Sequence, residues 1–184
     1  GLAAALSRAL SPKENAAPAQ PPLRASKVLV AIGSLHPAND AQLASLRQAG
    51  AVLVTLPEAA DPEAVAQEVR TAFARADVVC LMSPRSRAGA ADHAAALGAV
   101  VSRCTPAFDG LVATGGDTAR RIVDAMAAGS LTLFGEVEAG VPFGLLNLPG
   151  RRLPFATKAG GFGRAGTLLN CVTRLRADRE GEER

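Results

Sequence analysis

Short apolar runs alternate with segments of helical character along most of this chain, and this alternation restricts the fold more than any other feature. Val28–Ile32 is an all-apolar run that ends at Gly33, as expected of a strand buried on both faces. Further strands are predicted at 51–56, 78–82, 110–113, 131–134, 144–146 and 153–156. Helices are predicted at 38–49, 62–75, 88–102, 117–127 and 165–175. Strands and helices that alternate in this way form βαβ units, so we expect a single three-layer α/β/α domain with a mostly parallel sheet.

The two ends of the chain differ in composition from this regular part. A short helical segment at 2–10 is followed by a stretch rich in Ala, Pro and Gln that reaches residue 26 and is typical of an extended linker. At the other end, basic and acidic residues alternate, as in a solvated tail. We therefore expect 1–26 to be the remnant of a preceding domain with its linker, 27–176 to be the folded domain, and 177–184 to be a charged tail.

Composition argues against several classes of partner. Aromatic residues make up 3% of the chain, without Trp or Tyr, and the net charge is only +3, so a nucleic-acid surface is not expected. No apolar stretch is long enough to span a membrane, and we expect a cytoplasmic protein without a membrane partner. The three cysteines are odd in number and far apart, which favours neither a disulfide framework nor a zinc site.

The first of three glycine-bearing strand ends is Gly33-Ser34. Ligands of open parallel sheets bind at the carboxyl ends of the strands, so such turns are candidate sites. Gly33 allows a sharp turn, Ser34 offers a hydroxyl and a backbone amide, and a helix beginning at Pro37 would point its positive end at the turn. An ordinary helix cap made by Ser34 or His36 is an equally open interpretation.

The second glycine-bearing strand end is Gly115-Gly116-Asp117-Thr118. Paired glycines let a phosphate or a ribose approach the backbone, and the amides at the start of the following helix supply donors for an anion. Asp117 is negative and therefore suits either a helix cap or a contact with Mg²⁺, directly or through water. A plain glycine-rich turn capped by Asp117 remains the alternative.

The third strand end carries Lys158 before Gly160 and Gly161. A lysine on a glycine-rich loop combines charge with bare backbone amides, although the spacing does not match a Walker loop. Three such turns at strand ends favour a nucleotide over any one of them alone. A fourth segment, with Glu136 and Glu138 alternating along a strand, is interpreted as a polar strand face in preference to a metal site or a general base.

Taken in order, these segments resemble the C-terminal nucleotide-binding domain of the four-carbon acid sugar kinase family. The resemblance rests on residues 30–34, 110–119, 135–142 and 157–163 and spans 27–175. It implies a bacterial enzyme of carbohydrate metabolism that uses ATP, with ADP and Mg²⁺, to phosphorylate acids such as threonate or erythronate. It also implies contacts to the nucleotide from Ser34, Gly115, Gly116, Asp117, Thr118, Gly160 and Gly161, with Lys158 facing the phosphates.

The sequence departs from the family pattern in one respect, because almost the entire sugar-acid-binding domain is missing from it. We expect the chain to begin just before the interdomain linker, as a fragment or the product of a truncated gene, and to be inactive or nearly so alone. The sugar-acid-binding domain is the expected partner, a homodimer is left open, and no catalytic residue is assigned. The alternatives are a stand-alone module that binds another anion or a protein, and an enzyme of another class. The latter is weakened because no G-x-G-x-x-G follows the first strand.

Overall fold

The computed structural model describes residues 24–33, 36–59, 61–84 and 90–177. The helix expected at 2–10, most of the expected linker and the tail beyond residue 177 lie outside these residues. The strands are β1 (Val28–Ile32), β2 (Val52–Thr55), β3 (Val78–Met82), β4 (Gly110–Thr114), β5 (Ser130–Glu138), β6 (Val141–Leu148) and β7 (Arg151–Lys158). The helices are α2 (Ala38–Gln48), α3 (Pro62–Ala72), α4 (Ala90–Arg103), α5 (Gly116–Ala125) and α6 (Thr167–Arg176), with a 3₁₀ turn η1 at Thr105–Ala107.

All seven strands form one sheet in the order β2-β3-β1-β4-β7-β6-β5. The pairs from β2 to β7 are parallel, and β6 and β5 continue the sheet in antiparallel fashion. At the centre, Val30 of β1 lies between Cys80 of β3 and Val112 of β4. The prediction of a single α/β domain with a mostly parallel sheet is confirmed.

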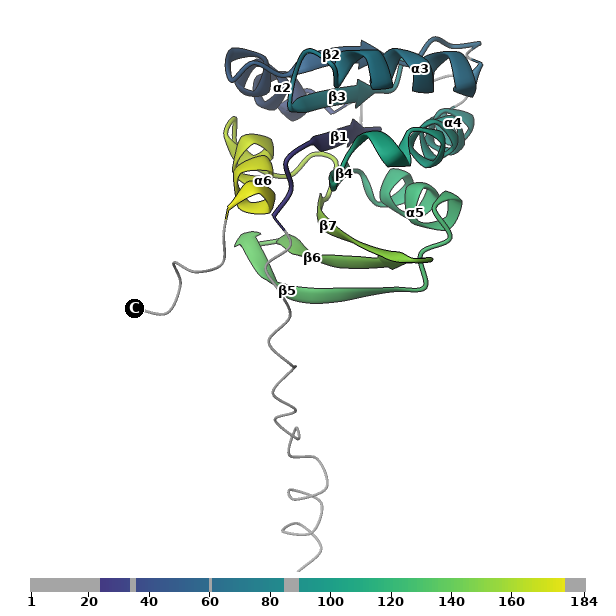
Figure 1. The fold of residues 1–184 in the computed structure, drawn as a ribbon. Coiled ribbons are helices and arrows are strands. Elements are labelled where there is room, and N and C mark those ends of the chain that lie inside the picture. Colours follow the sequence, from purple (N-terminus) through teal and green to yellow (C-terminus); the bar gives the residue numbers. More distant parts are fainter. Residues whose placement is uncertain (1–23, 34–35, 60, 85–89, 178–184) are drawn as a thin grey trace, which may run out of the picture.

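Helices cover both faces of the sheet (Figure 1), with α2 and α6 on one side and α3, α4 and α5 on the other. Successive β1 residues point to opposite faces: Leu29 packs in the core under α3, α4 and α5, whereas Val30 packs in the core under α2 and α6. Every residue of β1 is buried. This double burial explains why the first strand is an uninterrupted apolar run.

The last three strands are longer than predicted. The sequence predicts a strand that ends before Gly135 and another that begins at Gly144, whereas the structure places Gly135, Pro142 and Gly144 inside β5 and β6. Pro154 lies inside β7, as predicted, and faces Leu145 of β6. A Cβ at Gly144 would overlap the carbonyl oxygen of Thr132 and lie 2.9 Å from the Cα of Leu133. Gly144 therefore permits a close approach of β5 and β6 near a register shift, and it does not end the strand.

The folded domain includes residues just before its predicted start at 27. Ala25 is buried, and its amide donates to the carbonyl of Leu175 at the end of α6 over 2.8 Å. The amides of Ser26 and Lys27 both donate to a carboxylate oxygen of Asp109, at 2.8 and 2.6 Å. Residues 25 and 26, which the sequence assigned to a linker, thus pack against the domain.

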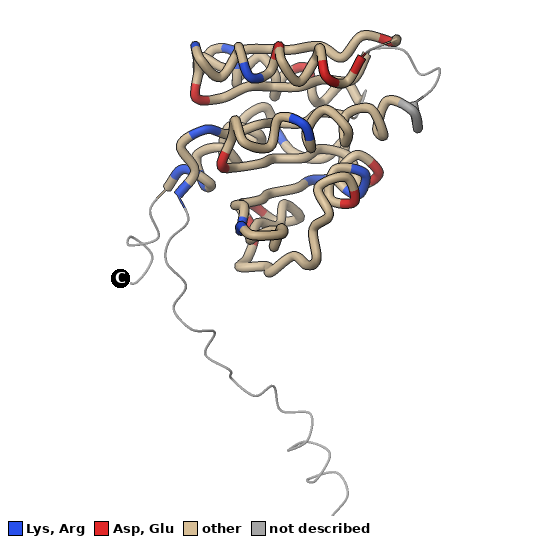
Figure 2. Tube along the Cα trace, turned by 45° about the vertical axis from the view of Figure 1, so that its right-hand side comes forward, with Lys and Arg blue, Asp and Glu red and all other residues tan. Residues whose placement is uncertain are grey.

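Charged residues are distributed over the whole described structure. Figure 2 shows Lys and Arg interspersed with Asp and Glu along the helices and turns. In the part of the chain that the structure describes, each helix is too short or too polar to cross a membrane.

Candidate functional site

The glycine-bearing turns singled out in the sequence meet at one edge of the sheet. Strands β1, β4 and β7 are parallel neighbours, so their carboxyl ends lie side by side. The turns are joined by backbone hydrogen bonds: Gly33 donates to Thr114 over 3.3 Å, and Gly115 donates to Lys158 over 3.0 Å. Because β6 runs antiparallel to β7, the turn between β5 and β6 lies at the same edge. This is the edge at which open parallel sheets bind ligands.

The turn after β4 leads directly into α5. Its helix begins at Gly116 after the N-cap residue Gly115, which has a φ of 94° that favours glycine, and no side chain caps it. Asp117 is therefore not the cap that the sequence analysis considered. Its carboxylate is 64% exposed and lies 4.0 Å from the guanidinium of Arg121. The first amides of α5 are thus left without a side-chain cap at the shared edge.

Gly116 differs from its neighbours in what surrounds it. Among the described residues, and apart from its chain neighbours and the backbone of α5 itself, a Cβ built there would meet no atom within 4 Å, and its φ does not lie in the left-handed region. Neither packing nor backbone conformation therefore requires glycine at this position. By contrast, a Cβ at Gly33 would overlap the hydroxyl of Thr118, which shows how closely the β1 turn packs on the start of α5.

The turn after β1 contacts the loop that follows β7. A Cβ at Gly161 would lie 2.9 Å from Cδ2 of His36. The Nδ1 atom of His36 accepts a hydrogen bond from the amide of Ala38 over 3.2 Å, at the start of α2. His36 thus makes the helix-capping contact that the sequence analysis allowed for it. Ser34, the other candidate of this turn, lies outside the described residues.

Lys158 lies at the end of β7 and is only 2% exposed. Its Nζ donates to the carbonyls of Ala159, Gly160 and Phe162 at 3.2, 3.1 and 2.9 Å, and to Oδ1 of Asn39 at 3.1 Å. Burial lowers the pKa of Lys158 from its ordinary value, against smaller opposing effects of Cys171 and Glu138. The ammonium group therefore holds the glycine-rich loop in shape, and a contact of Lys158 with phosphates remains a prediction.

The two carboxylates of β5 have separate roles in the structure. An oxygen of Glu136 accepts from the amide of Gly140 over 3.1 Å and so closes the turn between β5 and β6. Glu138 accepts from the hydroxyl of Thr167 at the start of α6. A register shift lies between the two glutamates, and their carboxylates accept from different elements of the fold. In the described residues, no group of three or more His, Cys, Asp or Glu side chains is placed to hold a metal ion.

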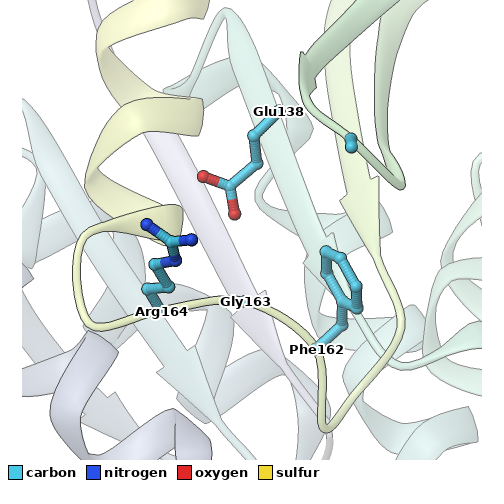
Figure 3. Close-up of a pocket in the computed structure, with 5 residues that line it drawn as sticks. Glu138, Phe162, Gly163 and Arg164 are labelled. Atoms are coloured by element: carbon cyan, nitrogen blue, oxygen red, sulfur yellow. The ribbon is translucent and has the colours of Figure 1, made fainter.

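A hollow of about 520 Å³ opens between this hairpin and the loop after β7 (Figure 3). Its lining includes two side chains that the sequence analysis did not select, Phe162 and Arg164, beside Glu138. Phe162 lies inside the glycine-rich motif of this loop, where an aromatic ring is a usable sequence signal. The contact between Glu138 and Thr167 joins elements that are far apart in the sequence, and no local sequence pattern indicates it.

Among the residues that the structure describes, two buried hydroxyls at the same edge have no hydrogen-bond partner. They belong to Thr114, the last residue of β4, and to Ser83, which directly follows β3. The backbone amide of Ser83 donates to the carbonyl of Ile32 over 2.9 Å, which ties this residue to the end of β1. Buried hydroxyls are nearly always paired in folded proteins, so this edge retains hydrogen-bonding capacity that the protein itself does not use.

Comparison with known proteins assigns this arrangement to a family. Residues 29–168 match the family model described as a nucleotide-binding C-terminal domain. The chain belongs to this family. The match confirms the resemblance to the C-terminal domain of the four-carbon acid sugar kinases.

The individual relatives are kinases and proteins of related structure. The chain is 36% identical to a D-threonate kinase of Bordetella bronchiseptica over 97% of its own length and 45% of that kinase's length. A D-threonate kinase of Cupriavidus necator is 49% identical over 63 residues, which are 32% of this chain and 15% of the kinase. The chain thus spans less than half the length of these relatives.

Solved structures agree with the fold. A crystal structure of a Bordetella bronchiseptica domain of unknown function, a domain-swapped dimer with bound citrate, is 37% identical, with a TM-score of 0.75 over 84% of this chain and 42% of that one. A Haemophilus influenzae protein is 15% identical, with a TM-score of 0.63 over 85% of this chain and 42% of that one, and it supports the fold alone.

Proposed function

We propose that this domain binds ATP or ADP with Mg²⁺ and forms the nucleotide-binding half of a kinase for four-carbon sugar acids of the threonate or erythronate type. The observation that carries the proposal is the convergence of the glycine turns on the uncapped start of α5. An anion at this point would receive backbone hydrogen bonds and the favourable end of the helix dipole. The open space at Gly116 leaves room for it.

The nucleotide phosphates would lie across two of these turns. In this proposal the backbone of Gly115, Gly116 and Thr118 meets one part of the phosphate chain, and Gly160 and Gly161 meet another. Ser34 would contribute its hydroxyl from the third turn. Lys158 would act from beneath, because its buried positive charge lies close under the loop that carries these glycines.

Mg²⁺ fits this site as a companion of the phosphates. The ion is usually held by one or two carboxylates together with phosphate oxygens and water, and the exposed carboxylate of Asp117 stands at the start of α5. Mg²⁺ would neutralise charge on the transferred phosphoryl group. The residues of this chain would bind and orient the nucleotide. The sugar acid would bind to a sugar-acid-binding domain, and that domain would also supply the base that accepts the proton of the reacting hydroxyl group. We therefore propose that the 184 residues alone transfer little or no phosphate.

Titration calorimetry with ATP–Mg²⁺ tests the proposal. We expect saturable binding at a single site, and an absence of binding at millimolar nucleotide would refute it. Adding a separately expressed sugar-acid-binding domain of a D-threonate kinase should then restore phosphorylation of threonate. A full rate without that domain would contradict the proposed division of labour.

A second candidate function is protein interaction through strand β5. This strand lies at the edge of the sheet, and its Leu131 and Leu133 side chains are 40% and 59% exposed. Exposed leucines on an edge strand favour contact with another protein surface. The partner we propose is the sugar-acid-binding domain or a second copy of the chain. Light scattering of the Leu133→Ser variant, alone and mixed with that domain, would show weaker association than the unchanged protein.

A further inference from the structure

The hollow beside the β5–β6 turn lies next to the proposed phosphate-binding turns. Its walls are the hairpin residues Glu138 and Ala139 and the loop residues from Phe162 to Arg164. Its volume of about 520 Å³ falls within the range of small-molecule pockets. The backbone carbonyl of Phe162 accepts hydrogen bonds from Nζ of Lys158 over 2.9 Å and from Nε2 of Gln42 over 3.0 Å. The loop that forms this wall is therefore held in place by hydrogen bonds from Lys158 and Gln42.

One loop connects the hollow with the phosphate side of the site. Gly161 packs against His36, which belongs to the turn after β1, whereas the next residues, Phe162 and Gly163, line the hollow. A molecule that lies on the glycine turns and extends across this loop would enter the hollow. A nucleotide has this shape, with charged phosphates at one end and an uncharged nucleoside at the other.

Phe162 supplies a flat apolar surface in the hollow. The residue is 43% exposed although it lies in a loop that hydrogen bonds hold in place. The ring leans on the hairpin, because a Cβ at Gly140 would lie 3.2 Å from its Cζ atom. Any nucleobase can stack on an exposed aromatic ring of this kind, because every base has a flat π-face.

Glu138 determines which kind of ligand the hollow accepts. One of its carboxylate oxygens accepts from the hydroxyl of Thr167, and Thr167 in turn accepts from the amide of Arg164 over 2.8 Å. Figure 3 shows the carboxylate between Arg164 and Phe162, facing the hollow. An ionised carboxylate only accepts hydrogen bonds, so its partner must be a donor such as a ribose hydroxyl or a base amine. A second phosphate or the carboxylate of a sugar acid would receive no hydrogen bond from Glu138.

We infer that this hollow binds the nucleoside end of the nucleotide, with the base against Phe162 and a hydroxyl or amino group on Glu138. The inference rests on the proposed function, since it extends the same site. Arg164 lines the hollow on the other side of the carboxylate.

Calorimetric titrations with ATP–Mg²⁺ and with inorganic tripolyphosphate–Mg²⁺ test this assignment. The variants are Phe162→Leu, which keeps an apolar side chain but removes the ring, and Glu138→Gln. Matched controls are Phe134→Leu, on the exposed strand β5, and Glu68→Gln, on the exposed face of α3. We expect each hollow variant to weaken ATP binding about tenfold and to leave tripolyphosphate binding unchanged. The controls should bind both ligands like the unchanged protein.

The outcomes separate the inference from the proposed function. If the unchanged protein binds ATP and both hollow variants bind it equally well, the inference is wrong and the proposed function stands. Equal losses for ATP and tripolyphosphate would also overturn the inference, because the variants would then act on the phosphate site. If the unchanged protein binds neither ligand, the proposed function itself fails.

Discussion

Replacing Gly33 with alanine tests how closely the turn after β1 must pack on the start of α5. The new Cβ would overlap Oγ1 of Thr118 and lie 2.7 and 2.8 Å from its Cβ and Cγ2 atoms. Rotating the threonine side chain cannot relieve the overlap, because its Cβ atom, which does not move on rotation, is also too close. Either β1 or α5 must therefore move. Overpacking of a buried site costs about 1–3 kcal/mol, and we expect about 2 kcal/mol for Gly33→Ala.

Urea unfolding gives this loss directly, and a second substitution identifies its cause. Thr118→Ala removes two of the three crowded atoms, so the double variant should recover about 1 kcal/mol relative to the sum of the single changes. The contrasting variant is Gly116→Ala, whose Cβ meets open space. It should keep the stability of the unchanged protein or exceed it by up to about 1 kcal/mol, and yet bind ATP at least about tenfold more weakly. Full stability of Gly33→Ala, or full ATP affinity of Gly116→Ala, would refute the reasoning.

Two further predictions concern buried titratable groups. Lys158→Met should cost about 1–3 kcal/mol, because it removes the donor to four oxygens, whereas Lys27→Met loses one hydrogen bond of an exposed lysine and should cost less than about 1 kcal/mol. Equal losses in urea unfolding would contradict the role of Lys158 in the loop. Burial raises the pKa of Cys80 from 9.0 to about 12, so the folded state keeps a proton that the unfolded state releases above pH 9. Stability should therefore fall between pH 9 and 12, and Cys80→Ala should reduce that slope by about 1.4 kcal/mol per pH unit. An unchanged slope would show that Cys80 ionises alike in both states.

Much of the sheet could be predicted because its strands are marked by local chemistry. The run at Val28–Ile32 is apolar throughout because β1 is covered by helices on both faces. The prediction failed where the role of a residue depends on contacts with residues far away in the sequence. The sequence predicts a strand that begins at Gly144, but this glycine lies inside β6, where it permits the close approach of β5.

In the candidate site, too, residues with a local sequence signal could be predicted, and residues that act through long-range contacts could not. Gly115 and Gly116 could be selected because paired glycines before a helix are a local pattern that lets a phosphate approach the backbone. The sequence also placed a charge at Lys158, but the direction of its ammonium group depends on α2, which brings Asn39 within 3.1 Å of it. Glu138 and Thr167 lie on β5 and α6, and only the folded chain brings them together.

Backbone NMR during a titration with ATP–Mg²⁺ tests the central claim most directly. The account predicts the largest amide shifts at Gly115, Gly116 and Thr118 and in the loop from Gly160 to Arg164, with little change on α3. Shifts that cluster elsewhere, or none at millimolar nucleotide, would contradict the assignment of this sheet edge as the nucleotide site.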